Sequence, residues 1–231
     1  DKNGYLKVET PILQSLAGGA SAIPFTTHHN ALDIDLYLRI APEIYLKKML
    51  IGGFEKIYEI GRNFRNEGID ATHNPEFTML EFYEAYSDAK KQMVFVEKFI
   101  KSIVKNILKK NLIKFSGENI DISKKFSTAS YFDLIKRHAL IIDIDKISKD
   151  DIAIKAKQFG IKVEDYENKE KIIDNIFKKI IRPKLIQPTF VTDYPLNYLP
   201  LAKKKEDNEE IVDSFQLYIG GLELVKAFSE L

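Results

Sequence analysis

The chain has 231 residues, of which 45% are hydrophobic and 30% are charged, a composition typical of a globular protein with one large domain or one and a half. Its 35 basic and 34 acidic residues leave a net charge of +1, which excludes a polycationic nucleic-acid-binding arm and an acidic tail. Cysteine is absent, so disulfides, a thiolate nucleophile and a cysteine zinc site are excluded as well. No apolar run approaches the roughly 20 residues that a membrane-spanning helix requires.

Both ends of the sequence have the pattern of an interrupted element. The chain starts with Asp1 rather than Met, and residues 2–5 resemble the end of an element already under way. Residues 221–231 form an apolar, strand-like run that stops without a turn signal. We therefore expect the chain to be a fragment of a longer protein.

Arginine is rare among the basic residues and unevenly placed. The five arginines are Arg39, Arg62, Arg65, Arg137 and Arg182, and all other basic residues are lysines. Three of the five fall between positions 39 and 65. Because lysine cannot reproduce a planar, bidentate guanidinium, this window is the first place to look for a functional site.

The first part of the chain predicts strands, one helix and a long hairpin. Pro42 stands where a first helical turn begins, and Gly52-Gly53 stands where the helix ends. The predicted elements, in chain order, are a strand at 5–9, a polar loop at 17–31, a half-buried strand at 32–40, a helix at 42–51, and strands at 54–65 and 77–87 joined by a loop at 66–76.

The second part predicts helices followed by strands. Asp88 is a suitable N-cap for a long amphipathic helix that ends near residue 110. The elements predicted after it are a small hairpin at 112–115 and 119–122, helices at 129–138, 149–158 and 168–181, and strands at 188–193, 211–219 and 222–230. Residues 111–185 are rich in lysine and are expected to form a helical peripheral or inserted region.

The order of the elements favours an α+β fold with an antiparallel sheet. Strands come first, then helices, then strands again, without the regular alternation of a doubly wound sheet. The sequence contains neither GxxxxGK[ST] nor GxGxxG, so a nucleotide site of the P-loop or Rossmann type is excluded.

The hairpin carries the residues best suited to a ligand. One face of strand 77–87 presents Phe77, Met79, Glu81, Tyr83 and Ala85, and the opposite face, predicted to be core, presents Leu80, Phe82 and Tyr86. The partner strand adds Glu59, Gly61, Asn63 and Arg65 on one face. Such a floor suits a ligand with a phosphate, an amine and a flat base, although a solvent-exposed face with ordinary cross-strand pairs has the same pattern.

Other polar residues have both a functional and an ordinary interpretation. The loop behind Arg65 holds Glu67, His73 and Asn74, a combination that suits phosphate, although a loop histidine is often a plain surface residue. Glu43 fits a helix cap as well as a ligand contact. The adjacent pair His28-His29 is not expected to bind a metal, because neighbouring strand residues point apart. On the last strand, alternation places Lys226, Phe228 and Glu230 on one face and Glu223, Val225 and Ala227 on the other.

These separate hints converge on one family. The stretch from Arg65-Asn66-Glu67 through His73-Asn74-Pro75-Glu76-Phe77 to Glu81 resembles motif 2 of class II aminoacyl-tRNA synthetases of the aspartate–asparagine–lysine subgroup, and residues 3–11 resemble the end of motif 1. The resemblance covers nearly the whole chain and is weakest at 110–180. The stretches similar to bacterial-type lysyl-tRNA synthetases are Gly18-Gly19-Ala20, residues 27–33, Tyr37-Leu38-Arg39-Ile40-Ala41-Pro42-Glu43, residues 186–195 and Phe228-Ser229-Glu230-Leu231.

The resemblance implies a class II synthetase fold, an antiparallel sheet flanked by helices, truncated at both ends. Residues 1–231 would be a partial catalytic domain that lacks the N-terminal anticodon-binding OB domain and the C-terminal motif 3, and this fragment alone would not complete catalysis. The implied reaction is the ATP-dependent activation of L-lysine and its transfer to tRNA(Lys), with Mg²⁺ as cofactor. A cytoplasmic homodimer with no membrane association is implied as well.

The resemblance also implies residue roles. Arg65 would be catalytic, contacting the α-phosphate of ATP and the lysine carboxylate. ATP would be bound by Arg65, Glu67, His73, Asn74 and Phe77, the last stacking on adenine. Lysine would be bound by Gly19, Glu43, Arg65, Glu81, Tyr83, Phe228 and Glu230. Glu223 would coordinate Mg²⁺.

Two positions depart from the family pattern. Gln216 stands where an acidic metal ligand is usual, and Lys226 stands where asparagine is usual, so one anion is lost and one cation is gained. Three other interpretations remain open: a lysyl or β-lysyl ligase that modifies elongation factor P, an aspartyl or asparaginyl synthetase, and a non-catalytic paralogue. Glu81, Tyr83 and Glu230 would form an anionic pocket, which disfavours an acidic substrate. The departures at 216 and 226 keep the non-catalytic paralogue open.

Overall fold

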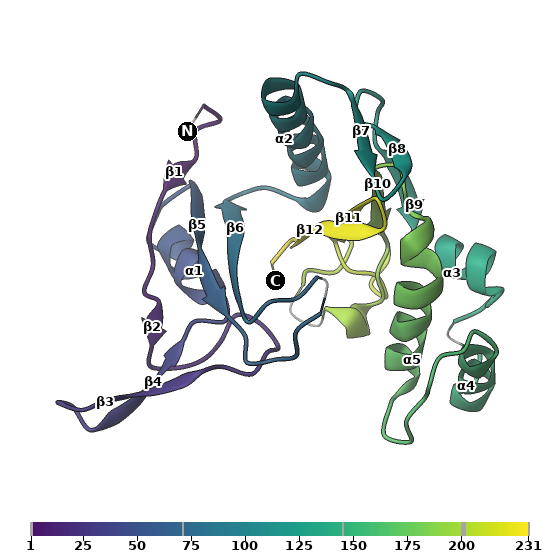
Figure 1. Ribbon diagram of the computed structural model, residues 1–231, viewed down its shortest axis with the longest axis horizontal. Coiled ribbons are helices and arrows are strands. Elements are labelled where there is room, and N and C mark those ends of the chain that lie inside the picture. The colour runs from purple at the N-terminus through teal and green to yellow at the C-terminus, as the bar shows by residue number, and fades with distance from the viewer. Residues whose placement is uncertain (1, 71, 145, 200–201, 231) are drawn as a thin grey trace. The chain divides into compact units, whose positions relative to one another are not determined.

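The computed structural model describes residues 2–70, 72–144, 146–199 and 202–230, and the chain forms two compact units, residues 1–86 and 87–231 (Figure 1). Each unit combines sheets with helices, so the predicted α+β class is confirmed.

The first unit contains two small sheets and a helix. Its elements are β1 (Leu6–Lys7), β2 (Leu13–Gln14), β3 (Thr26–His29), β4 (Ile34–Leu38), α1 (Glu43–Ile51), β5 (Lys56–Phe64) and β6 (Glu76–Glu84). The strand orders are β1-β5-β6 and β2-β4-β3. The predicted hairpin is confirmed as β5 and β6, which pair antiparallel along their whole length. The predicted polar loop at 17–31 contains β3, which pairs with β4 in an antiparallel hairpin, drawn at the lower left of Figure 1.

Helix α1 packs on one face of the β5–β6 hairpin. Pro42 occupies the N-cap and Gly52 the C-cap, as their positions in the sequence predict. Leu46 of the helix is fully buried against Ile57 of β5 and Val8, and Tyr83 of β6 packs at the edge of this cluster. The helix therefore fixes the face of the hairpin that also carries Glu59 and Glu81.

The opposite face of the hairpin is not a core face. Leu80 is 37% exposed and Tyr86 is 96% exposed, so the prediction that they are buried was wrong; Ile60, on the paired strand, is 53% exposed. The physical reason is that α1 and the side chain of Arg39 pack on the other face, where Ile57, Glu59 and Asn63 are buried. The aromatic and aliphatic residues of β5 and β6 thus cover both faces, and alternation alone could not assign the buried one.

The second unit is built on a four-stranded sheet of order β12-β11-β10-β9. Its strands and helices are α2 (Ala89–Leu108), β7 (Leu112–Phe115), β8 (Glu118–Asp121), β9 (Ser127–Ser130), α3 (Tyr131–Ala139), α4 (Lys149–Gln158), α5 (Lys169–Ile176), β10 (Thr189–Thr192), β11 (Ser214–Ile219) and β12 (Leu222–Phe228). A π-helical turn (Phe177–Ile181) and short 3₁₀ turns (Arg182–Lys184 and Leu196–Tyr198) complete it. The N-cap predicted for α2 is confirmed, since the Asp88 side chain accepts a hydrogen bond from the Lys91 N–H at 2.7 Å.

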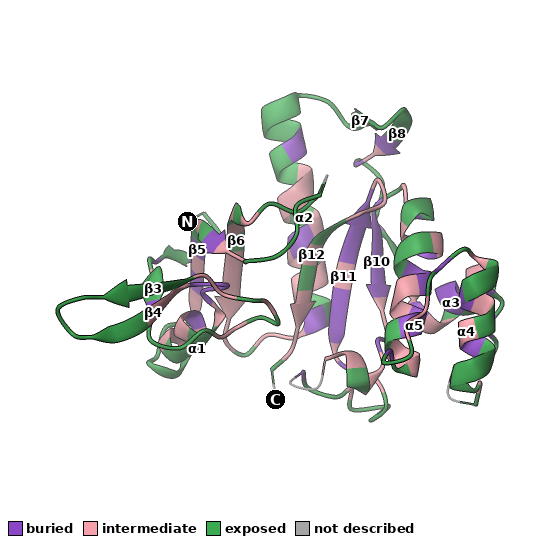
Figure 2. Ribbon diagram, turned by 60° about the horizontal axis from the view of Figure 1, so that its bottom comes forward, coloured by how far each residue is buried: buried purple, intermediate pink, exposed green. Residues whose placement is uncertain are grey.

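Helices α3 to α5 supply much of the buried core of this unit. The ring of Tyr131, at the start of α3, lies 5.0 Å from that of Phe177 and 4.9 Å from that of Tyr194. These rings pack with Val191 of β10 and Tyr218 of β11 in one continuous cluster. Figure 2 shows β10 and β11 as mostly buried strands beside these helices. The helices predicted between 111 and 185 therefore support the sheet that carries Gln216.

Three local predictions differ from the structure. Residues 127–130 form strand β9, and the helix predicted from 129 begins at Tyr131. Strand β9 pairs in parallel with β10, and β1 pairs in parallel with β5, so the sheets are not purely antiparallel. The helix predicted at 168–181 is α5 followed by the π-helical turn. Short, polar β9 has no alternation to indicate a strand, because only its long-range pairing defines it.

Candidate functional site

The paired strands β5 and β6 form the floor of the predicted site. Their register places Glu59 opposite Glu81 and Asn63 opposite Phe77. Arg65 follows the end of β5, and its backbone N–H donates to the Pro75 carbonyl at 2.8 Å, closing the base of the intervening loop. The Arg65 guanidinium carbon lies 5.0 Å from the centre of the Phe77 ring, a cation–π distance. The structure therefore brings Arg65 and Phe77 together, as the sequence predicts.

Glu81 is the most perturbed carboxylate on this floor. The Tyr83 hydroxyl donates to Glu81 Oε2 at 3.0 Å, although these residues are neighbours on the same strand face. The pKa of Glu81 is raised to about 7, mainly by burial and also by the nearby carboxylates of Glu43 and Glu59, while Tyr83 and Arg65 oppose the shift. A half-buried carboxylate with too little compensating charge is a candidate for binding a cation.

Glu43 and Gly19 meet at the start of α1. The Gly19 backbone has φ +87°, and a Cβ placed there would lie 3.0 Å from the Glu43 Cβ and 3.3 Å from the Ala41 Cβ. Only glycine adopts this conformation and allows this approach without strain. The Glu43 carboxylate forms an ion pair with Lys47 one turn along the helix. The two residues predicted to receive an α-amino group are thus adjacent.

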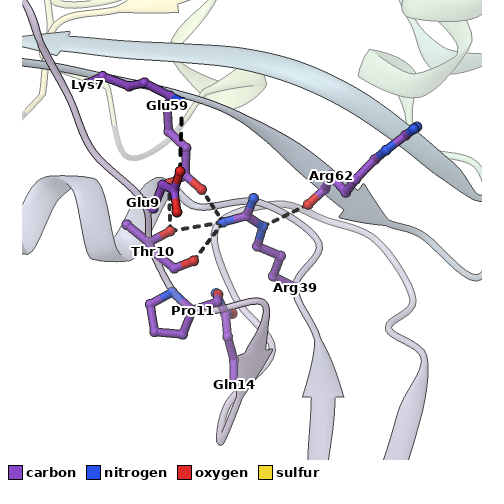
Figure 3. Close-up of polar contacts among 8 residues, drawn as sticks. All are labelled: Lys7, Glu9, Thr10, Pro11, Gln14, Arg39, Glu59 and Arg62. Carbon is purple, nitrogen blue, oxygen red and sulfur yellow. Dashed lines mark hydrogen bonds and ion pairs between the residues drawn. The ribbon is translucent and has the colours of Figure 1, made fainter.

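A buried ion pair that the sequence did not predict lies on this same face of the hairpin, beside Glu81. Arg39 is 2% exposed and Glu59 is 3% exposed, and Arg39 Nη1 donates to Glu59 Oε1 at 2.5 Å (Figure 3). Arg39 also donates to the Thr10 hydroxyl at 3.0 Å and to the Arg62 carbonyl at 2.8 Å, and the Thr10 hydroxyl donates to Glu59 Oε2 at 2.7 Å. A Cβ at Gly61 would overlap the Arg39 guanidinium, so this position requires glycine. In the sequence, the only indication of this ion pair is the concentration of arginines between positions 39 and 65.

The loop between β5 and β6 carries the remaining nucleotide residues predicted. His73 Nδ1 lies 2.8 Å from Asp70 Oδ2, and Asn74 Nδ2 donates to the Glu76 carbonyl at 2.6 Å. The backbone N–H of Thr72, followed by His73, lowers the pKa of Asp70 well below its usual range. Glu67 is exposed. The loop therefore presents His73 at the surface, already paired with a carboxylate.

The second unit carries Glu223, Phe228 and Glu230, the other predicted site residues, on or just after β12. In the register of β11 and β12, Gln216 faces Lys226 and Ser214 faces Phe228, but an irregularity after Leu217 brings Glu223 opposite Tyr218. A β-bulge of this kind shifts the alternation, so Glu223 shares the face of Lys226 and the prediction of opposite faces was wrong. The Tyr218 hydroxyl lies 3.4 Å from Glu223 Oε2, in agreement.

Gln216 is held by two tyrosines on this same face. The Tyr194 hydroxyl donates to Gln216 Oε1 at 2.7 Å, and the Tyr218 hydroxyl donates to the same oxygen.

In the part of the chain that the structure describes, no group of three or more histidine, aspartate and glutamate side chains is arranged to hold a metal ion. Among these residues, too, no helix is long and apolar enough to cross a membrane.

Comparison with known proteins identifies the family that the motif on the hairpin resembles. A family model described as tRNA synthetases class II (D, K and N) matches residues 1–231, and the chain belongs to this family. Relatives named lysine--tRNA ligase are 47% identical in Pelotomaculum thermopropionicum, 49% in Prochlorococcus marinus and 46% in Clostridium tetani, each over 100% of this chain. The chain spans about half the length of these curated relatives, 46% of the first two and 47% of the third.

The buried ion pair generates a prediction about stability. Arg39→Met leaves the Glu59 carboxylate buried without a cation, which is expected to cost about 3–5 kcal/mol of unfolding free energy. Adding Glu59→Gln to this variant should recover much of the loss, because the unpaired charge is then gone. Urea denaturation measures both effects.

The matched control for this experiment is Arg62→Met, at an exposed arginine of the same hairpin. Its effect should stay within about 0.5 kcal/mol. Equal stability of the Arg39→Met and Arg62→Met variants would contradict the structural role of the pair.

The raised pKa of Glu81 generates a prediction about pH. Its pKa in the folded protein is about 7, above the ordinary 4.5, so the folded state binds more protons between these values. Raising the pH from 4.5 to 7 therefore destabilises the protein through this residue, and Glu81→Gln removes that contribution. The variant should gain stability relative to the wild type across this window and keep the gain above it.

Urea denaturation at a series of pH values tests this expectation, and the exposed residue Glu76 provides the control variant Glu76→Gln. The gain should be absent from that control. Parallel pH profiles for the wild type and the Glu81→Gln variant would show that the environment of Glu81 has been misjudged.

Proposed function

We propose that the full-length protein containing this chain is a lysine–tRNA ligase. It would activate L-lysine with ATP to form lysyl-adenylate and then transfer the lysyl group to tRNA(Lys). The names of the relatives support this assignment, since they are 44–49% identical to the chain over nearly all of it. The observation that carries the proposal is the Glu81–Tyr83 pair on the floor of the hairpin.

The Glu81–Tyr83 pair suits the side-chain ammonium of lysine. Glu81 is half-buried, accepts a hydrogen bond from Tyr83, and has too little positive charge around it to keep its pKa near the ordinary value. The ammonium group of a lysine substrate would supply that positive charge, and the Tyr83 phenol would lie beside it. An acidic or amide side chain would leave the carboxylate uncompensated, which disfavours aspartate and asparagine as substrates.

Glu43 and Gly19 suit the α-amino group of the same substrate. They adjoin each other at the start of α1, where the Glu43 carboxylate has only the partly exposed Lys47 as an ion-pair partner among the described residues. With Phe228 and Glu230 of the second unit they complete the proposed set of lysine-binding residues. A substrate with two ammonium groups therefore has a carboxylate proposed for each.

Arg65 is the proposed catalytic residue. In the adenylation step, an oxygen of the lysine carboxylate attacks the α-phosphorus of ATP, a new P–O bond forms, and the bond to the β-phosphate oxygen breaks as pyrophosphate leaves. No protein nucleophile is needed, so catalysis consists of positioning and charge stabilisation. Arg65 would contact both the lysine carboxylate and the α-phosphate. Its backbone is fixed by Pro75 and its guanidinium lies beside Phe77.

The remaining nucleotide contacts are proposed for β6 and the loop before it. Phe77 would stack on adenine, Glu67 and Asn74 would hold the nucleotide, and His73 would meet the outer phosphates. In this role His73 would keep its contact with Asp70 through Nδ1 while a phosphate approaches the ring.

Mg²⁺ is the proposed cofactor, bound at Glu223. Mg²⁺ in nucleotide sites takes one or two protein carboxylates and completes its coordination with phosphate oxygens and water. The exposed Glu223 carboxylate fits this requirement for an ion that would bind together with ATP. The ion would neutralise phosphate charge as pyrophosphate departs.

The proposal extends to features that lie with the full-length protein. By analogy with the family, we propose a cytoplasmic homodimer with an anticodon-binding domain before this chain and motif 3 after it. Residues 111–185, whose helices pack in the core of the second unit, would then be a largely helical region of the catalytic domain.

Amino-acid-dependent ATP–pyrophosphate exchange tests the proposed function on the full-length protein. The panel contains lysine, β-lysine, aspartate and asparagine, and exchange is expected with lysine alone. Preference for β-lysine would instead indicate a ligase that modifies elongation factor P. Absence of exchange with all four would favour the non-catalytic paralogue.

The role of Arg65 is tested in the same assay. Arg65→Lys keeps the charge but loses the planar, two-point contact, and is expected to lower kcat for exchange roughly 10²- to 10³-fold. Arg62→Lys, at the exposed arginine three residues earlier, should leave the rate within about twofold. Equal rates for the two variants would remove Arg65 from the catalytic role.

A further inference from the structure

The face of the β11–β12 hairpin that carries Glu223 has an unusual polar composition. Gln216 and Lys226 are directly opposite each other in the register, and the bulge brings Glu223 onto the same face. Directly opposed residues have Cβ atoms about 4.5–5.5 Å apart, so the amide and the ammonium share one small surface with the carboxylate. This surface contains one anion, one cation and one neutral amide.

The Gln216 oxygen is fully used inside the protein. It accepts hydrogen bonds from the hydroxyls of both Tyr194 and Tyr218. An amide oxygen has two lone pairs, so both are occupied and none remains for a metal ion. The other end of the amide is the NH₂ group, which donates hydrogen bonds. Position 216 therefore offers a donor for anionic oxygen where a metal would need an acceptor.

The Lys226 ammonium, by contrast, is available. The residue is exposed, and among the described residues it forms no ion pair with a carboxylate. Its fixed positive charge disfavours a second divalent cation close by and attracts phosphate oxygens. The amide donor of Gln216 and the ammonium of Lys226 thus favour the same kind of ligand.

We propose that this surface binds the phosphates of ATP with a single divalent ion, held at Glu223, and that the Lys226 ammonium takes the place of a second one by contacting a phosphate oxygen directly. The inference rests on the proposed function, because it requires that ATP binds with its phosphates at this surface. Gln216 adds a neutral hydrogen-bond donor to the same phosphate group. Relative to the family pattern, residue 216 has lost a negative charge and residue 226 has gained a positive one. Both changes would favour phosphate over a second metal ion at this surface.

The number of bound ions is measurable without catalysis. Mn²⁺ replaces Mg²⁺ as a spin-active probe, and electron paramagnetic resonance counts the Mn²⁺ ions bound per protomer of full-length protein in the presence of ATP and the absence of lysine. The wild type is expected to bind one Mn²⁺ per ATP. The double variant Gln216→Glu, Lys226→Asn, which restores an anion and removes the cation, is expected to bind at least one more.

Single variants separate the two residues and allow for poor folding of the double variant. Lys226→Asn alone should weaken ATP binding about tenfold or more, the loss expected for one charge-assisted hydrogen bond, whereas Lys226→Arg should keep most of the affinity. Lys162→Asn, at an exposed lysine after α4, is the matched control and should change neither affinity nor ion number.

ATP binding is measured in the same samples by equilibrium dialysis. Two or more Mn²⁺ ions on the wild type, or unchanged ATP affinity in Lys226→Asn, would overturn the inference while leaving the proposed function intact. No ATP binding at all would overturn both. One ion on the wild type, a second on the double variant and rescue by arginine would establish Lys226 as the replacement cation.

Discussion

The buried ion pair between Arg39 and Glu59 is the constraint on which the first unit depends. Two opposite charges this deeply buried are tolerated only when their remaining hydrogen-bonding groups are satisfied, and Thr10 and the Arg62 carbonyl meet that need. The partners come from positions far apart in the chain, so the pair joins the segment after β1, the end of β4 and the middle of β5. The Arg39 carbonyl also accepts from the Phe64 N–H at 2.9 Å, which fixes the end of β5 immediately before Arg65.

This pair also affects the charge of the hairpin face on which it lies. Glu59 lies opposite Glu81, and Arg39 compensates Glu59 but not Glu81. Glu43 adds a further carboxylate near Glu81. The result is a partly buried surface with an excess of negative charge, which suits the doubly cationic amino acid that we propose as the substrate. Position 61 must remain glycine for the same reason, because a side chain there would displace the guanidinium that pairs with Glu59.

The sequence predicts the parts of this arrangement that depend on local pattern. Helix α1 between Pro42 and Gly52, the cap of α2 at Asp88 and the long hairpin all have short-range signals, and motif 2 carries the resemblance to the family. The Arg39–Glu59 pair has no short-range signal in the sequence. Its residues lie 20 positions apart, and a sequence does not distinguish buried charges from surface charges. Strand β9 and the parallel pairings depend on distant partners. The bulge in β12 places Glu223 on the same face as Lys226. Strict alternation along the strand predicted opposite faces for these two residues, because it does not allow for a bulge.

We propose that the site selects its amino acid through the half-buried Glu81 carboxylate, whose charge is incompletely compensated. Calorimetric titration of the full-length protein with lysine and with norleucine tests it most directly, since norleucine has the same aliphatic chain length but no side-chain ammonium. A site that buries a polar partner for a missing group typically rejects the analogue by roughly 10⁴-fold or more, and lysine is expected to bind more tightly by about that factor. Affinities for the two amino acids within about tenfold of each other would contradict the account.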